Sequence, residues 1–125
     1  MEIMKIRFAR HTTNLQRMLN FYCGLIGLEL ITRFENHEGY DGIILGDGSN
    51  NWEVEFTSSS DAPSHIPDTD DILVFYFDSR EKYNSMLEKL KQEGIKRLTP
   101  SNPYWGIHGI TVADPDGFRV VISLL

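Results

Sequence analysis

Residues 13–28 read TNLQRMLNFYCGLIGL and decide the fold. The stretch begins as a capping box at Thr13 and continues with apolar residues at helical spacing, until glycines at 24 and 27 end it. Residues 78–94 read DSREKYNSMLEKLKQEG and repeat this plan, from a second capping box at Asp78 to a closing glycine. The chain is therefore expected to contain two short amphipathic helices of the same kind.

Each expected helix follows one extended run and precedes three more. The runs before the helices are Ile3–Thr12 and Ile72–Phe77, and both are rich in branched or aromatic side chains. Residues typical of turns separate the later runs. The later expected strands are 28–34, 42–45 and 52–57 in the first half, and 95–98, 107–112 and 118–124 in the second. Each half is thus predicted to have the order βαβββ.

The two halves align as an internal repeat. The paired positions, about 67 to 69 residues apart, are Met18 and Met86, Gly27 and Gly94, and Gly48 and Gly117. We interpret the chain as a duplication within one domain, with module 1 at about 1–58, a linker at about 59–70 and module 2 at about 71–125. The expected fold class is α+β, in which tandem βαβββ modules form a curved, cup-shaped mixed sheet and its helix-free face lines a cavity.

The composition is that of an acidic chain with enough apolar material for one core. It has 125 residues with seven Phe, five Tyr and two Trp, which is long enough for one domain without disulfides. The formal net charge of −6 argues against nucleic acid as a partner. Charged residues interrupt the apolar N-terminal stretch and no apolar run approaches a membrane span, so we expect no membrane partner and a cytoplasmic location. Cys23 is the only cysteine, and we expect a packed core thiol rather than a nucleophile.

Strand alternation identifies polar side chains that face away from the helices. In the run 52–57 the odd-numbered residues, Glu55 among them, point to the free face, and Arg7 takes this position in the first strand. A carboxylate between two core residues is costly to desolvate unless it meets a cation or a metal. Glu55 is therefore a candidate functional residue, with a solvated sheet face as the alternative interpretation. The same alternation places Tyr76 and Arg119 on the free face of the second half.

Several sequence strings give the chain a family resemblance over nearly its whole length. They are Asn20-Phe21-Tyr22 with Gly24-Leu25-Ile26-Gly27-Leu28, then Glu55-Phe56-Thr57, then Asp114-Pro115-Asp116-Gly117-Phe118. In this order, and with the duplicated plan, the chain resembles the vicinal oxygen chelate superfamily of glyoxalases, bleomycin-resistance proteins and dioxygenases. A narrower resemblance, to the YycE-like bacterial members, rests on residues 35–42, 73–76 and 102–105. The resemblance implies a glyoxalase/bleomycin-resistance-like fold and a homodimer, with or without exchange of halves between chains.

The resemblance also implies metal ligands on the first and last strands of each half. In this sequence those positions hold Arg7, Glu55, Ile72 and Val121. Only Glu55 has a side chain that binds metals, whereas dedicated sites normally gather about three protein ligands. We therefore expect no metal or other cofactor, and we expect Arg7 to replace the charge of the metal and to contact Glu55. A relocated divalent metal site that uses His11 and Glu55 is the alternative.

Aromatic residues in two predicted loops are expected to rim the cavity. Tyr40 lies in the first loop, and Tyr104 and Trp105 lie in the second, each between the second and third strands of its half. Such rings are suited to hold a flat organic ligand, although the second pair is equally suited to seal a subunit interface. The other members of the expected ligand-binding set are Arg7, His11, Glu55, Tyr76 and Arg119.

Two classes of function follow from these residues. The first is a protein that binds a small organic ligand in the sheet cavity without the usual metal, as bleomycin-resistance proteins do, and that is not an enzyme. The second is an enzyme, either a metal-dependent lyase, isomerase or dioxygenase with shifted ligands, or a metal-free enzyme with Glu55 as the catalytic base. An interaction module is disfavoured because the sequence has no basic or disordered arm. The identity of the ligand is left open.

Overall fold

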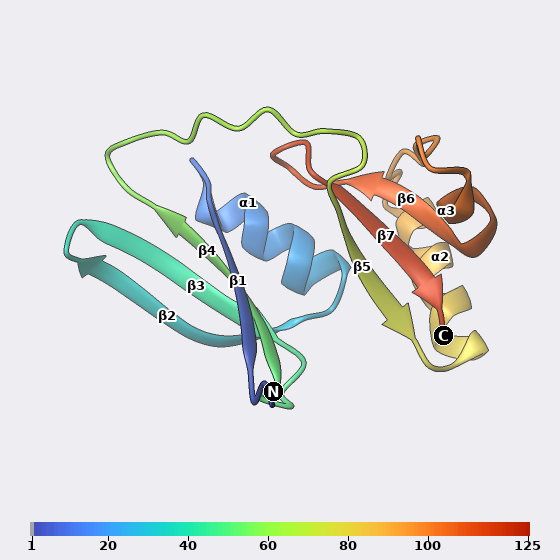
Figure 1. Ribbon diagram of the computed structural model, residues 1–125, viewed down its shortest axis with the longest axis horizontal. Helices are drawn as coiled ribbons and strands as arrows, with labels where there is room; N and C mark the ends of the chain where they lie inside the picture. Colours follow the sequence, from blue (N-terminus) through green and yellow to red (C-terminus); the bar gives the residue numbers. More distant parts are fainter. Residues whose placement is uncertain (1) are drawn as a thin grey trace. The chain divides into compact units, whose positions relative to one another are not determined.

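The computed structural model describes residues 2–125, which form both the helices and the strands expected for an α+β chain (Figure 1). The elements are β1 (Ile6–His11), α1 (Leu15–Leu19), η1 (Asn20–Leu25), β2 (Glu29–His37), β3 (Tyr40–Gly46), β4 (Trp52–Ser58), β5 (Ile72–Phe77), α2 (Arg80–Gln92), α3 (Pro103–His108), β6 (Gly109–Ala113) and β7 (Arg119–Leu124). The α+β class is confirmed.

Strand pairing produces two mixed sheets. The first is four-stranded, in the order β1-β4-β3-β2, and the second is three-stranded, in the order β5-β7-β6. In each sheet the first strand pairs in parallel with the last, and the other pairs are antiparallel. The sheets belong to two compact units, unit 1 (Met1–His65) and unit 2 (Ile66–Leu125).

The paired glycines of the internal repeat have the same backbone conformation. Gly27 and Gly94, which follow the helices, have φ of +99° and +67°. Gly48 and Gly117, which lie in turns, have φ of +85° and +88°. Residues with a side chain rarely adopt this left-handed region, so glycine is favoured at these turns. The repeat seen in the sequence therefore corresponds to a repeat of backbone geometry.

The first helix differs in its cap from the sequence expectation. Asn14, and not Thr13, is the N-cap, because its Oδ1 accepts a hydrogen bond of 3.0 Å from the backbone N–H of Arg17. After Leu19 the helix widens into the π-helical segment η1. Cys23 lies in η1, half-buried, and burial raises the pKa of its thiol, which agrees with a packed rather than a reactive cysteine.

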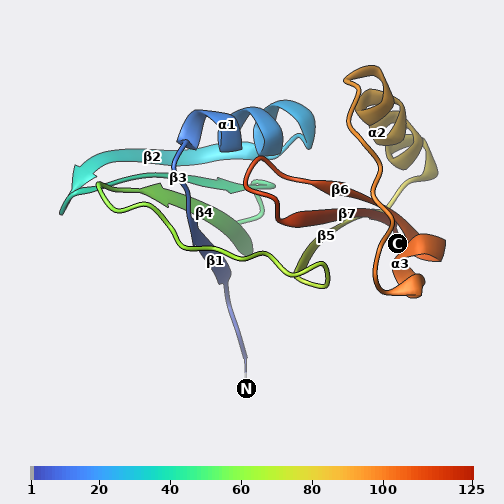
Figure 2. The same cartoon turned by 90° about the horizontal axis from the view of Figure 1, so that it is seen from above.

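The core of unit 1 lies between the first helix and one face of the four-stranded sheet (Figure 2). Val54 and Phe56 of β4 are buried, and the Phe56 ring stacks on Tyr22 of η1 at 4.9 Å between ring centroids. The predicted alternation in β4 is thus confirmed. Residues of the opposite parity, which include Glu53 and Glu55, lie on the sheet face that the helix does not cover.

Unit 2 lacks one strand that the sequence predicts. Residues 95–98 form no strand, and only Leu98 makes an isolated bridge, to Thr111. Pro100 and Pro103 follow closely, and proline has no N–H to donate to a ladder. Pro103 instead occupies the first turn of α3, a helix that takes up Ile107 and His108, which were expected to begin the next strand. No helix within residues 2–125 is long and apolar enough to cross a membrane.

Candidate functional site

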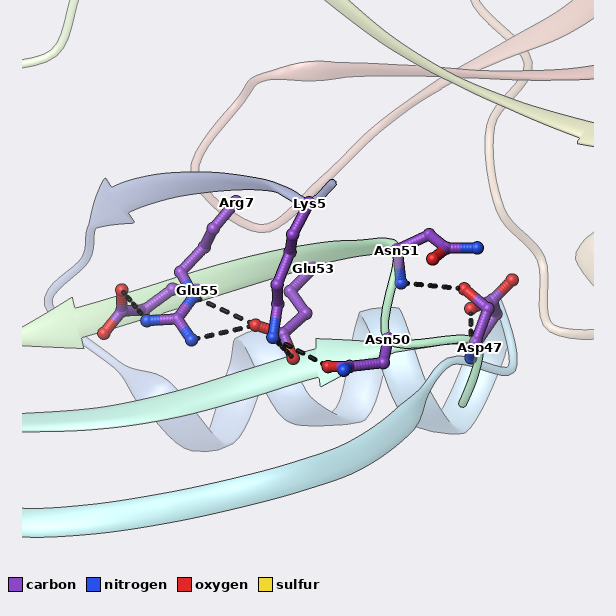
Figure 3. A network of polar contacts seen from close by, with 8 residues as sticks. Lys5, Arg7, Asp47, Asn50, Asn51, Glu53 and Glu55 are labelled. Carbon is purple, nitrogen blue, oxygen red and sulfur yellow. Dashed lines mark hydrogen bonds and ion pairs between the residues drawn. The ribbon is translucent and has the colours of Figure 1, made fainter. Parts of the chain in front are cut away.

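The parallel pairing of β1 with β4 determines which side chains meet on the face of the first sheet that the helix does not cover. This surface is called the open face below. The register places Arg7 beside Glu53, Ala9 beside Glu55 and His11 beside Thr57. All of these residues have the parity opposite to the buried Val54 and Phe56. Charged side chains from the two strands therefore lie together on one surface, as Figure 3 shows.

Arg7 makes its hydrogen bonds with Glu53. Its Nε and Nη2 donate to Oε1 of Glu53 at 3.0 and 2.9 Å, so one edge of the guanidinium is fixed. The remaining nitrogen, Nη1, lies 3.8 Å from Oε1 of Glu55, within ion-pair range and beyond hydrogen-bond length. The expected contact between Arg7 and Glu55 is present, but it is the weaker of the two.

Burial separates the roles of the two glutamates. The Glu53 side chain is 5 % exposed and that of Glu55 is 16 % exposed, whereas Arg7 is 43 % exposed. Within residues 2–125, the Glu55 carboxylate accepts no hydrogen bond. Glu53 therefore anchors the arginine, and Glu55 and the Nη1 end of Arg7 keep hydrogen-bonding capacity on the open face.

Lys5 joins the charge network next to the turn between β3 and β4 (Figure 3). Its Nζ lies 3.0 Å from Oε2 of Glu53 and donates to Oδ1 of Asn50 at 2.8 Å. The Lys5 hydrogen bond, with a smaller contribution from Arg7, lowers the pKa of Glu53 against the opposing effect of desolvation. In the same turn Asp47 accepts a hydrogen bond from Ser49, which lowers the pKa of Asp47 and orders the loop. Lys5 and Arg7 together with Glu53 and Glu55 thus form a cluster whose formal charges cancel.

His11 and Tyr40 lie at the other end of this face. Nδ1 of His11 shares a hydrogen bond of 2.8 Å with Thr57 Oγ1, and Nε2 is 3.0 Å from Ser59 Oγ and 2.9 Å from the Asp61 carbonyl oxygen. The Tyr40 ring is 5.6 Å from the His11 ring. Tyr40 is the first residue of β3 and not a loop residue, because the turn before it is shorter than expected and the strands continue to His37 and Tyr40.

The remaining predicted ligand residues belong to unit 2. Tyr76 and Arg119 lie on strands β5 and β7 at positions of the same parity, and Nη1 of Arg119 donates to the carbonyl oxygen of Thr99 at 2.9 Å. Tyr104 and Trp105 are in helix α3 and not in a loop, since Asn102 caps the segment and Pro103 favours its first turn. Their rings contact each other at 4.8 Å.

The side chains at the expected metal positions do not fit a divalent ion. The carboxylates of Glu53 and Glu55 already face cations, so a metal ion would meet the charges of Lys5 and Arg7. Both ring nitrogens of His11 are engaged by oxygen atoms, which leaves the relocated site with Glu55 without a free imidazole. Within residues 2–125, no three His, Cys, Asp or Glu side chains are grouped as metal ligands.

Two members of the cluster, Lys5 and Glu53, were missed by sequence reasoning. Glu53 has the same strand parity as Glu55, which was the available signal. The sequence does not give the register between β1 and β4, however, and a shift of two residues preserves the face while exchanging the partner.

Comparison with known proteins identifies the family. Residues 6–57 match the family model of the YycE-like N-terminal domain, and residues 70–123 match that of the YycE-like C-terminal domain. The protein YycE of Bacillus subtilis (strain 168) is 38 % identical over 120 residues, which cover 94 % of this chain and 85 % of that protein. A crystal structure of YycE from Bacillus subtilis, of unknown function, superposes with a TM-score of 0.85 at 35 % identity, covering 97 % of this chain and 89 % of that chain.

More distant structures share the fold. Glyoxalase I of Leishmania major has a TM-score of 0.74 at 16 % identity and covers 99 % of this chain and 86 % of its own. TnmS3, an antibiotic binding protein from Streptomyces sp. CB03234, has a TM-score of 0.68 at 16 % identity and covers 99 % of this chain and 95 % of its own. The chain therefore belongs to the YycE-like family and has the fold of the glyoxalase/bleomycin-resistance group.

Proposed function

We propose that this protein binds a small organic ligand without a metal, on the open face of the first sheet at Arg7 and Glu55. The proposal rests on the distance of 3.8 Å between Nη1 of Arg7 and Oε1 of Glu55, which is too long for a hydrogen bond between them. One partner is a hydrogen-bond donor and the other an acceptor, and neither is satisfied by the other. The Glu55 side chain is 16 % exposed, so its carboxylate is accessible to a hydrogen-bond donor of a ligand.

The ligand group that suits this pair both donates and accepts a hydrogen bond. A hydroxyl or an amide accepts from Nη1 of Arg7 and donates to Glu55, and it adds no net charge to the balanced cluster. Glu53 holds the guanidinium in place before binding, so little side-chain entropy is lost when the ligand arrives. The site is thus suited to a neutral polar group rather than to a free anion.

Apolar contact area is available on the neighbouring strands. Ile44 of β3 lies beside Glu55 in the register but is buried, whereas the partly exposed Phe34 ring of β2 lies over Gly42, where any added Cβ would collide with it. Tyr40, half-exposed and on the same face of β3, adds a ring beside His11. Aromatic and aliphatic side chains of this kind contribute most of the contact area in small-molecule sites. The description of TnmS3 as an antibiotic binding protein of the same fold supports this class of function.

One observation favours an enzyme as the second candidate. The Glu55 carboxylate accepts no hydrogen bond within residues 2–125 and is therefore chemically available as a general base. A base role requires turnover that is lost in Glu55→Gln while the ligand still binds. A binding role requires that Glu55→Gln and Arg7→Gln both weaken binding.

The proposal is tested by ligand-observed NMR with a set of small phenols and aromatic amides in the presence of EDTA. The wild type is expected to bind members of the set, and Arg7→Gln and Glu55→Gln are each expected to weaken binding by about tenfold, the effect of a lost charge-assisted hydrogen bond. Arg33→Gln removes an exposed arginine from β2 of the same sheet and serves as the control. Equal affinities in all four proteins would exclude the site, and loss of binding in EDTA would exclude the metal-free mode.

A further inference from the structure

A groove in unit 2 is separate from the residues of the proposed function. It lies between the C-terminal half of α2 and strand β6, and its volume is about 460 Å³. Its apolar lining consists of Leu87, Leu90, Ile95, Ile110 and Val112. The volume lies within the range of about 300 to 1,000 Å³ that is usual for small-molecule sites.

The missing strand explains why this surface is left open. In unit 1 the strand after the helix, β2, has nine residues and pairs along β3. In unit 2 the corresponding segment contributes only the bridge of Leu98 to Thr111, so β6 is an edge strand. The side chains of Ile110 and Val112 and the adjoining face of α2 therefore border the groove without a strand beside them.

The charged side chains that line the groove are all positive. Lys91 and Arg97, both exposed, are the only charged residues in its lining, and no Asp or Glu within residues 2–125 lines it. The backbone carbonyls of Leu90 and Lys91 at the end of α2 accept hydrogen bonds from Ile95 and Gly94, which reduces their repulsion of an anion. Two cations beside an apolar hollow, in a chain of net charge −6, complement a molecule that is apolar with one negative end.

We propose that this groove binds an amphipathic carboxylate, that is, a molecule with one carboxylate and an apolar chain or ring. The carboxylate contacts Lys91 and Arg97, and the apolar part covers Leu87, Ile95 and Ile110, which are the partly exposed apolar residues of the lining. Arginine pairs with both oxygens of a carboxylate, while lysine adds a point charge. Removal of the apolar surface from water supplies the remainder of the affinity.

Titration with dodecanoate below its micellar concentration, followed by backbone amide NMR and calorimetry, tests the proposal. We expect saturable 1:1 binding with shifts centred on residues 87–97 and 110–112. The double variant K91Q/R97Q is expected to weaken binding about fivefold or more, since two exposed ion pairs are lost. The double variant K82Q/K96Q removes the same charge from positions outside the groove and is expected to bind as the wild type does.

Three results would overturn the proposal. They are the absence of saturable binding, equal weakening by K82Q/K96Q and K91Q/R97Q, and binding of dodecan-1-ol as tight as that of dodecanoate. Both double variants change only exposed side chains, so their folded state, checked by circular dichroism, is expected to be unaffected.

Discussion

At the residue scale, the two glutamates on β4 illustrate how register assigns roles to similar side chains. Glu53 and Glu55 have the same parity, yet only Glu53 lies beside Arg7 and receives both of its hydrogen bonds. Glu55, two residues further along, is held only by the looser ion pair. The residue that fixes the arginine is therefore distinct from the residue that is available to a ligand.

The lowered pKa of Glu53 predicts a pH dependence of stability. Because its folded-state pKa lies below the ordinary value of 4.5, the charged form stabilises the fold above that value. This contribution is lost as the pH falls through the folded-state pKa. Urea denaturation between pH 7 and pH 3 should show a midpoint difference between wild type and Glu53→Gln that is largest at neutral pH and shrinks below about 4.5.

Glu35→Gln serves as the control for this measurement, because Glu35 is exposed on β2. Its midpoint should follow that of the wild type at every pH. A difference between wild type and Glu53→Gln that stays constant over the whole range would show that Glu53 does not carry the effect.

At the scale of elements, helices and most strands could be predicted from the sequence because their signals are local. Residues 72–77 are rich in branched and aromatic side chains, and β5 has these same bounds. The segment 95–98, which reads IKRL, carries a weaker signal and has only one pairing residue, because sheet pairing also depends on neighbours that the segment itself does not encode. For the candidate site, strand alternation predicts the sheet face and the presence of Arg7 and Glu55 on it. It does not predict that Glu53 is the main partner of Arg7, because that depends on the register between β1 and β4.

The cap of α1 yields a prediction that separates two readings of the sequence. Asn14 accepts a hydrogen bond from the N–H of Arg17, so Asn14→Ala should lower the free energy of unfolding by about 1 kcal/mol. Thr13→Ala is the matched control and should change it by less than about 0.5 kcal/mol, since Thr13 is exposed and does not cap the helix. The free energies of unfolding are measured by urea denaturation. A larger decrease in Thr13→Ala than in Asn14→Ala would show that Thr13, and not Asn14, caps the helix.

At the scale of the whole molecule, the exposed apolar surface of β1 bears on assembly. β1 is an edge strand of its sheet, and its residues Ile6 and Phe8 are exposed. An exposed apolar edge strand is a ready surface for association. We therefore propose a homodimer in which the edge and apolar side chains of β1 are covered by a second copy.

Light scattering coupled to size exclusion should then give twice the chain mass of 14.4 kDa. The double variant I6E/F8E is expected to shift the protein toward the monomer, because charges on an edge strand oppose pairing. Ile66→Glu changes an exposed apolar residue outside the strands and should leave the dimer intact. A monomeric wild type, or a dimer that persists in I6E/F8E, would contradict this assembly.

On the first sheet, two cations, Lys5 and Arg7, are balanced by the carboxylates of Glu53 and Glu55. Arg7 lies at the first-strand position where related metal-binding members are expected to have a ligand, and its charge is balanced by Glu53 and Glu55. This arrangement predicts that a divalent ion is not needed for the binding of a ligand.

Elemental analysis by mass spectrometry, on protein purified without chelator, tests this claim most directly. The expected result is no divalent metal at stoichiometric level in the wild type. One tightly bound equivalent of a divalent ion, lost in both Glu55→Gln and His11→Ala, would contradict the account.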